Sequence, residues 1–340
     1  MRYLVTGGLG VVGSKFVALA LEDKENEVTI VDAAESPRNH FMWKHLASTY
    51  GDRVKFVIER IEKYPFGMLL RDHDRLLHAA AHTGIPHSSE VPNDDWLSNV
   101  DATKNILDYM LHAQVKIPTV MLSSVKPYAT PKFNMHVEGK RWVLDGVEKN
   151  GLTEQSPLEP DEPYAASKMA QSAIAQAYAR TFDLPITVLR CSNLYGDAPC
   201  HGPRHGWLTW LCICAAMGWT FELQGTGFQT RDMLFTDDVA KAVFRAFGRM
   251  PACQGEVFNV GGGKANTISV LEACELAKVE TSKGEGRKHE DMCVYVDHSK
   301  FTTATGWSPK IQVDEGMARI IAWAKDHSSA LDFIYQDAKK

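Results

Sequence analysis

Apolar and polar residues follow two different periods along the first 190 positions. Short apolar runs rich in valine, isoleucine and leucine predict strands, and longer stretches in which apolar residues recur every three or four positions predict helices. The predicted strands are residues 3–6, 28–31, 54–58, 75–78, 119–122 and 186–189, and the helical patterns between them include residues 14–22, 96–112 and 164–181. Strands that alternate with helices predict an α/β fold, a doubly wound parallel sheet with helices on both faces.

The alternation weakens from about residue 191, where proline, glycine and tryptophan become frequent and apolar runs such as residues 257–260 are isolated. This change predicts a second, smaller lobe beside the sheet. We therefore expect one domain at residues 1–190 and a lobe made mainly of residues 191–340. The boundary between them is soft, because later segments can return to the sheet.

Composition narrows the possible partners. The chain of 340 residues carries 42 acidic and 37 basic residues, a formal net charge of −5, which disfavours binding to nucleic acid or to an anionic membrane. No stretch of about 18 apolar residues predicts a membrane span, and the first strand begins too early for a signal peptide. The cytoplasm is therefore the expected location.

The seven cysteines are scattered over the chain, which favours reduced thiols over a disulfide framework. Some of them lie in a cluster with histidines: Cys200, His201, His205, Cys212 and Cys214. Because this spacing matches no standard zinc pattern, we expect no metal site.

Three glycines, Gly7, Gly10 and Gly13, follow the first predicted strand and open the first predicted helix. Glycine at such a turn lets a pyrophosphate approach the backbone and the positive end of the helix, which is typical of a Rossmann-type dinucleotide site. Asp32 ends the next strand, where a carboxylate binds the two hydroxyls of a ribose and repels a 2′-phosphate. The pattern favours NAD over NADP; the alternative is a glycine-rich turn that holds no ligand.

A second candidate site combines Tyr164 and Lys168, spaced as Y-x-x-x-K at the start of a predicted helix. This spacing places both side chains on one helix face, where the cation should lower the pKa of the phenol and make Tyr164 a proton acceptor. Ser123 and Ser124 follow the strand at residues 119–122, at the sheet edge where open α/β sheets bind ligands. The structural alternatives are an exposed tyrosine beside a solvated lysine, and a serine that bonds only to the backbone.

Three segments resemble the extended short-chain dehydrogenases/reductases that act on nucleotide sugars. TGGLGVVG at residues 6–13 is similar to the cofactor loop of that family, HAAA at 78–81 to its strand beside the nicotinamide, and NVDAT at 99–103 to its N-V-x-G-T helix. The family usually has Gly-Asp-Ile where this chain has Glu59, Arg60 and Ile61, so the acid expected near adenine is missing. The resemblance implies a bound NAD contacted by Gly7, Leu9, Gly10, Val11, Val12, Gly13, Asp32, Ile61, Ala79, Ala80, Asn99, Ser123, Tyr164 and Lys168.

The same resemblance implies roles at the reacting centre. Tyr164 is the expected catalytic base, Ser124 polarises the sugar oxygen, and Lys168 holds Tyr164 and the nicotinamide ribose. The expected assembly is a homodimer formed by the helices at residues 96–112 and 164–181. The expected substrate is a nucleotide-diphosphate sugar bound by Lys126, Asn193, Trp207, Arg231 and Arg287.

Related dehydratases carry an Asp-Glu pair where this chain has Val125 and Lys126, so dehydration is disfavoured. Four features resemble a narrower group, the CDP-paratose (CDP-tyvelose) 2-epimerases: the hydroxyl-x-Lys arrangement at 124–126, Glu138 with Arg141-Trp142, H-G-W-x-x-W at 205–210 and Q-x-R-D-x-L at 229–234. This chain differs from that group at Val125, Asn193 and His205, where the group has Asn, Ser and Gln, and the resemblance implies that these positions affect the pocket for the sugar.

The expected function is therefore an NAD-dependent epimerase that oxidises a nucleotide-linked sugar to a keto sugar and returns the hydride to the other face, and the resemblance to the narrower group implies carbon 2 as the centre. Two alternatives stay open. One is a UDP-sugar 4-epimerase, and the other is a catalytically silent NAD-binding sensor or scaffold.

Overall fold

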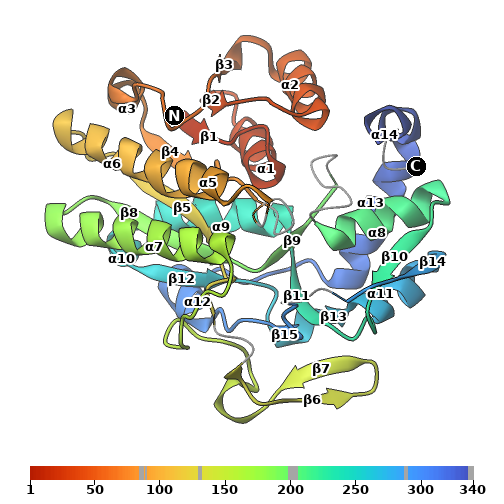
Figure 1. The fold of residues 1–340 in the computed structure, drawn as a ribbon. Helices are drawn as coiled ribbons and strands as arrows, with labels where there is room; N and C mark the ends of the chain where they lie inside the picture. The colour runs from red at the N-terminus through yellow and green to blue at the C-terminus, as the bar shows by residue number, and fades with distance from the viewer. Residues whose placement is uncertain (84–87, 89, 129–131, 198–205, 287–289, 336–340) are drawn as a thin grey trace.

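A seven-stranded parallel sheet forms the centre of the computed structural model, which describes residues 1–83, 88, 90–128, 132–197, 206–286 and 290–335. The strand order is β12-β8-β5-β4-β1-β2-β3, so the order reverses between β1 and β4 (Figure 1). Open parallel sheets bind ligands at the carboxyl ends of the strands beside such a reversal. The strands are β1 (Arg2–Thr6), β2 (Glu27–Asp32), β3 (Val54–Ile58), β4 (Arg75–His78), β5 (Thr119–Ser124), β8 (Ile186–Cys191) and β12 (Val257–Val260).

The predicted doubly wound α/β fold is confirmed, and all six predicted strands lie in this sheet. β3 and β4 have the predicted bounds. β5 and β8 run two residues further than predicted, because the pairing of Ser124 with Cys191 continues the ladder beyond the apolar run. β12 pairs with β8, although its sequence lies in the region expected for the second lobe. All four of its residues are buried, as a strand covered on both faces requires.

Helices cover both faces of the sheet, as the alternation of side chains in β1 shows. Tyr3 and Val5 pack with α1 (Val11–Ala20), α2 (Pro37–Tyr50), α9 (Thr236–Gly248) and α12 (Ser299–Thr305). Leu4 points to the other face, with α3 (Gly67–Asp72), α6 (Ala102–His112) and α7 (Pro163–Phe182). The helix predicted at residues 96–112 begins as a π-helix, Trp96–Asp101, preceded by α5 (Pro92–Asp95).

The smaller lobe has its own apolar core, formed largely by α8 (Trp207–Met217), α11 (Val270–Ala277), α13 (Val313–Asp326) and α14 (Ser328–Ile334). β11 (Thr230–Phe235) pairs there with β9 (Asn193–Tyr195), β13 (Thr267–Ser269) and β15 (Cys293–Val294), and β10 (Phe221–Gln224) pairs with β14 (Thr281–Gly284). A hairpin of β6 (Met135–Glu138) and β7 (Arg141–Leu144) extends from the bottom of the molecule in Figure 1. The short helical turns are α10 (Met250–Cys253), Gly51–Arg53, Gly146–Glu148 and Lys264–Asn266.

Within the described ranges, no helix is both long enough and apolar enough to cross a membrane. The described cysteines are buried free thiols: Cys191, Cys212, Cys214, Cys253, Cys274 and Cys293. Cys200, His201 and His205, which belong to the cluster noted in the sequence, lie outside the described residues.

Candidate active site

The glycine turn after β1 brings three backbone segments into close contact. Gly7 has a positive φ of 69°, and a Cβ there would overlap the backbone of Ala80, just after β4. A Cβ at Gly13 would overlap the carbonyl oxygen of Gly7, which accepts a hydrogen bond from the amide of Gly10 at 3.1 Å. Both positions therefore require glycine. The turn leads directly into α1, whose N-terminal end is a favourable place for a pyrophosphate.

Asp32, at the carboxyl end of β2, lies beside this turn. Its carboxylate accepts hydrogen bonds from the amides of Leu9 at 3.0 Å and Ala34 at 2.9 Å. Burial raises the pKa of Asp32, and the two amide hydrogen bonds act against that rise. A carboxylate fixed next to a glycine turn fits the ribose of NAD and disfavours the 2′-phosphate of NADP.

Arg60 stands where the resemblance leads one to expect an acid near adenine. Its guanidinium is held by carboxylates, with Nη1 2.8 Å from Glu35 Oε1 and Nε 2.5 Å from Glu62 Oε1. The neighbouring Ile61 is buried in the core, and its carbonyl oxygen accepts a hydrogen bond from the Asn105 amide at 3.2 Å. The departure in sequence thus places an ion-paired arginine at this point of the fold.

The other residues expected around a cofactor lie near the same strand ends. The amides of Ala79 and Ala80, just after β4, donate to the backbone oxygen and the hydroxyl of Thr6 at 3.1 and 3.3 Å. Asn99 lies in the π-helix, and its side-chain amide donates to Ser167 of α7 at 2.9 Å. Val11 and Val12 form the first turn of α1. The structure therefore brings most of the expected cofactor residues to one edge of the sheet.

Ser124 and Tyr164 meet at the carboxyl end of β5. Ser124 is the last residue of β5, Tyr164 is the second residue of α7, and their side chains share a hydrogen bond. The Tyr164 amide donates to the Ser88 hydroxyl at 3.0 Å, which fixes the start of α7. The expectation that Lys168 lowers the pKa of Tyr164 is wrong for this structure. Burial raises the pKa of the phenol, and the hydrogen bond from Ser124 opposes the rise.

Lys168 is buried on the side of α7 that packs against β5, and its ammonium donates to groups other than Tyr164. Nζ lies 3.2 Å from the carbonyl oxygen of Leu122 and 2.9 Å from Oε1 of Gln171. Burial lowers the pKa of Lys168 to about 8. The ammonium can therefore lose its proton close to neutral pH.

Gln171 continues a buried chain of hydrogen bonds toward the glycine turn. Its side-chain amide donates to Thr103 Oγ1 at 3.1 Å, and His78 lies between Thr103 and Thr6, at 2.9 and 2.7 Å from the two hydroxyls. Burial lowers the pKa of His78 to about 3, so the imidazole is neutral. The chain joins α7 to β1, the strand that leads into the glycine turn, and so couples the position of Lys168 to that turn.

Ser123 faces α7. Its hydroxyl donates to the carbonyl oxygen of Lys168 at 3.1 Å and accepts a hydrogen bond from the hydroxyl of Ser172 at 2.8 Å. These bonds hold α7 against β5. The cofactor contact expected for Ser123 stays a prediction.

Two of the three cations expected to bind substrate, Lys126 and Arg231, are already paired with carboxylates. Lys126 Nζ lies 2.5 Å from Asp291 and 3.3 Å from Glu162. Arg231, a buried residue of β11, lies 2.5 Å from Glu290. An anionic substrate must therefore compete with acids of this chain.

The remaining residues expected to bind substrate belong to the smaller lobe. Asn193 lies in β9, where it pairs with Met233 of β11. Trp207 is the first residue of α8, and its side chain packs against the apolar core of that lobe. Arg287 lies outside the described residues.

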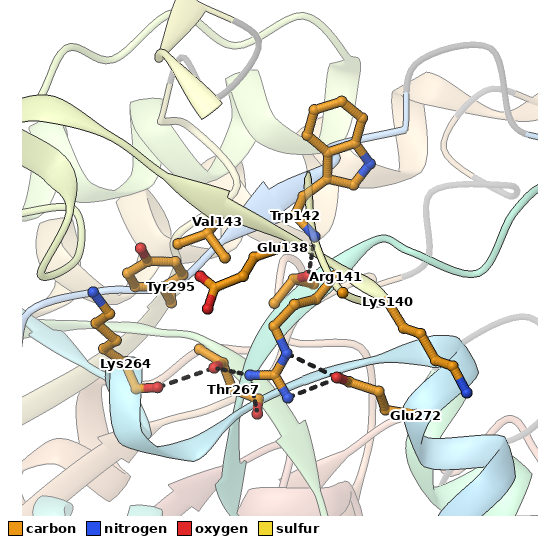
Figure 2. Close-up of a pocket in the computed structure, with 11 residues that line it drawn as sticks. Glu138, Lys140, Arg141, Trp142, Val143, Lys264, Thr267, Glu272 and Tyr295 are labelled. Atoms are coloured by element: carbon orange, nitrogen blue, oxygen red, sulfur yellow. Dashed lines mark hydrogen bonds and ion pairs between the residues drawn. The ribbon is translucent and has the colours of Figure 1, made fainter. Parts of the chain in front are cut away.

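The β6–β7 hairpin carries Glu138, Arg141 and Trp142, which resemble the 2-epimerase group. Figure 2 shows the Arg141 guanidinium directed toward Glu272 of α11 and Thr267 of β13, at 2.8 Å from Glu272 Oε2 and 3.1 Å from Thr267 Oγ1. A cavity of about 460 Å³ lies among the hairpin, β11 and α11. These contacts fix the hairpin to the smaller lobe.

Sequence reasoning missed Glu162, Gln171 and Asp291. Gln171 follows Lys168 by three residues and lies on the same helix face, so the helical spacing carried a signal for it. Glu162 precedes Tyr164 by two residues, and nothing in that spacing indicates its partner. No local pattern could pair Lys126 with Asp291, because 165 positions separate them.

Residues 3–261 match the NAD dependent epimerase/dehydratase family. The chain is 26% identical to CDP-paratose 2-epimerase of Salmonella typhi over 337 residues, which cover 95% of this chain and 99% of that protein. It is 30% identical to dTDP-glucose 4,6-dehydratase of Actinoplanes sp. over 344 residues, which cover 97% of this chain and 99% of that protein. Both types of enzyme are thus similar to this chain over nearly its whole length.

Solved structures share the fold. A dTDP-glucose 4,6-dehydratase from Streptomyces venezuelae with NAD bound has a TM-score of 0.81 and 26% identity, covering 98% of this chain and 100% of that chain. UDP-glucuronic acid 4-epimerase from Bacillus cereus, in complex with UDP-glucuronic acid and NAD, has a TM-score of 0.79 and 22% identity, covering 96% and 99%. This chain belongs to the NAD-dependent epimerase/dehydratase family, and NAD is its cofactor.

Proposed function

We propose that this protein is an NAD-dependent epimerase of a nucleotide-diphosphate sugar, which inverts carbon 2 through a transient keto sugar. The observation that carries the proposal is the hydrogen-bonded pair of Ser124 and Tyr164 at the carboxyl end of β5, at the same end of the parallel sheet as the glycine turn that follows β1. Two hydroxyls at this point can hold the oxygen of a sugar carbon that is first oxidised and then reduced. The likeness to CDP-paratose 2-epimerase, with Lys126 two residues after Ser124, supports the choice of carbon 2.

Ser124 and Tyr164 act on the same sugar hydroxyl in this mechanism. Tyr164 takes the hydroxyl proton during oxidation and gives it back during reduction, while Ser124 bonds to the sugar oxygen. Bound NAD⁺ supplies the hydride acceptor and a positive charge. Because burial raises the pKa of Tyr164, the phenol keeps its proton unless a positive charge lies close to it. Lys168, held by Leu122 and Gln171, is the positioning cation of the site.

Residues 125 and 126 favour epimerisation over dehydration. The related dehydratases are expected to use an Asp-Glu pair at these positions to move protons during loss of water. Val125 is buried and has no proton to exchange, and Lys126 is a cation engaged by two carboxylates. The proposal therefore assigns no elimination step to this protein.

Arg231 is our candidate for the diphosphate of the substrate, because a guanidinium bonds phosphate oxygens in a fixed fork. The diphosphate would replace Glu290 as the partner of Arg231. We also infer a homodimer formed through α6 and α7, which light scattering coupled to size-exclusion chromatography tests.

Thermal shifts of the NAD-loaded protein with CDP, UDP, TDP and GDP test the nucleotide part of the proposal, because a ligand that binds only the folded state raises its stability. Selective stabilisation by CDP supports the 2-epimerase, and NMR of the product from a CDP-linked deoxyhexose then identifies the inverted carbon. Inversion only at carbon 4, or a preference for UDP, favours a 4-epimerase. No shift with any nucleotide favours a silent NAD-binding protein.

A further inference from the structure

Thr103, the second residue of α6, lies in the middle of the buried hydrogen-bond chain that ends at Lys168. Its hydroxyl donates to the backbone oxygen of Asn99, one turn earlier, at 2.7 Å. A threonine hydroxyl has one proton, so Oγ1 can only accept from its two other neighbours, Gln171 at 3.1 Å and His78 at 2.9 Å. Thr103 therefore sets the direction of both hydrogen bonds.

His78 follows this direction. Burial lowers the pKa of His78 to about 3, so the imidazole is neutral and carries a single N–H. That proton lies on Nε2, because Thr103 accepts there, and Nδ1 is left as an acceptor for the hydroxyl of Thr6 at 2.7 Å. Thr6 in turn accepts from the amide of Ala80 at 3.3 Å. Each hydroxyl thus uses its proton once, and no two hydrogen bonds of the chain conflict.

Gln171 can bond to Thr103 only through its amide nitrogen. Its side-chain oxygen, Oε1, then faces Lys168, whose ammonium donates to it at 2.9 Å and to the carbonyl oxygen of Leu122 at 3.2 Å. With the amide turned over, Oε1 would meet a hydroxyl that has no proton left, and the NH₂ group would meet the ammonium. Gln171, Thr103 and Lys168 are at most 2% exposed, so a reversed amide would leave buried polar groups without partners.

The orientation of this amide matters because burial already opposes the charge of Lys168 and lowers its pKa to about 8. Among the surrounding titratable groups, Asp95 of α5 favours the charged form. The thiol of Cys191, the imidazole of His78 and the phenol of Tyr164 are uncharged near neutral pH, because burial raises the pKa of the first and third and lowers that of the second. An amide oxygen at 2.9 Å supports the ammonium through its dipole, and a reversed amide would oppose it.

We propose that Thr103 is a positioning residue of the active site: it fixes the direction in which Gln171 presents its oxygen and so keeps Lys168 charged. His78 supports the same arrangement, because it donates to the second lone pair of the Thr103 oxygen. The inference rests on the proposed function in one respect, since it takes the charged form of Lys168 to be the form that supports Tyr164. Loss of the Thr103 hydroxyl frees the amide to turn over, and the ammonium then loses its proton at a lower pH.

Thr103→Val removes the hydroxyl and keeps the shape of the side chain. NMR of the NAD-loaded protein, labelled with ¹³C at the ε carbon of lysine, gives the pKa of Lys168, whose signal is identified by its loss in Lys168→Met. We expect Thr103→Val to lower this pKa by about 0.5 or more, and to move the basic limb of the pH–rate profile down by the same amount. Thr103→Ser keeps the hydroxyl and should keep the pKa of the unaltered protein.

Thr119→Val is the matched control. This buried hydroxyl also donates to a backbone oxygen, that of Ile117 at 2.9 Å, but it lies at the opposite end of β5 from Ser124. Its loss should leave the pKa of Lys168 unchanged.

The outcomes separate this inference from the proposed function, because the NMR titration needs no sugar. A pKa that is unchanged in Thr103→Val, or that falls equally in Thr103→Ser or Thr119→Val, overturns the inference and leaves the proposed function standing. Should Thr103→Val fail to fold, Gln171→Met removes the oriented oxygen itself; a lowered pKa supports the inference, and an unchanged pKa overturns it. If the pKa falls as expected but no nucleotide sugar is turned over, the positioning stands and the proposed function fails.

Discussion

Asp232 offers a quantitative test that needs no substrate. Its carboxyl is completely buried in β11, where it accepts hydrogen bonds from the amides of Gly263 at 3.2 Å and Val296 at 3.5 Å. Burial raises the pKa of Asp232 to about 7, and these hydrogen bonds compensate only in part. Because ionisation of this carboxyl is unfavourable in the folded protein, Asp232 destabilises the fold at neutral and higher pH.

Replacing Asp232 with Asn removes the ionisation and keeps an oxygen that can accept from the two amides. Since the pKa of the folded state is raised, the folded protein binds more protons than the unfolded chain between about pH 4 and pH 7, and the stability of the unaltered protein falls as the pH rises through this range. A difference of about three pKa units corresponds to about 4 kcal/mol. We expect Asp232→Asn to be about 4 kcal/mol more stable than the unaltered protein at about pH 8, and to lose this advantage by about pH 4.

Urea unfolding followed by tryptophan fluorescence at about pH 4, 6 and 8 measures this difference. Every other titrating group is common to the two proteins, so its contribution cancels when the free energies of unfolding are subtracted. Asp326→Asn, at the exposed end of α13, controls for the loss of one charge and should change the stability by about 0.5 kcal/mol or less. A difference between Asp232→Asn and the unaltered protein that stays constant with pH would refute the reasoning.

Three further predictions concern the site. Tyr164→Phe should lower kcat by about 10³-fold or more and leave NAD binding intact, since only the phenolic hydroxyl that exchanges the proton is lost; rapid turnover by this variant would remove Tyr164 as the base. Gly13→Ala should abolish the thermal shift caused by NAD, because its Cβ overlaps the turn. A Cβ at Gly67 in α3 meets only the Tyr109 ring, at an ordinary van der Waals distance of 3.5 Å, so Gly67→Ala should keep the shift. Gln171→Glu should raise the pKa of Lys168 from about 8 and move the basic limb of the pH–rate profile upward; an unmoved limb would contradict the assigned contact.

The parallel sheet could be predicted because strands buried on both faces are continuous apolar runs. The position of β12 could not be predicted from the sequence. The run Val257–Val260 would look the same in a strand of the sheet and in a strand of the smaller lobe, and only its pairing with β8 shows that it belongs to the sheet. The C-terminal end of β5 could not be predicted from apolar residues either, since Ser124 continues the strand pairing through its backbone although its side chain is polar.

In the candidate site, too, features set by residues close together in the sequence could be predicted, and features set by distant contacts could not. Helical spacing placed Tyr164 and Lys168 on one helix, and the strand end placed Ser124 beside them. The charge state of Tyr164 could not be predicted, because it depends on burial by the whole fold. The hydrogen-bond partners of Lys168 could not be predicted either. Its ammonium donates to the carbonyl oxygen of Leu122, which lies 46 positions away in the sequence, and to the side-chain oxygen of Gln171.

The most direct test of the central claim is the hydrogen content of the product formed in D₂O from the nucleotide sugar that binds best. Mass spectrometry after return to H₂O, together with proton NMR, shows whether water has been lost and where deuterium has entered. The account predicts a product with the mass of the substrate, inverted at one carbon, that carries no deuterium at that carbon, because the same hydride leaves and returns. Loss of water, or solvent deuterium at the inverted carbon, would contradict it.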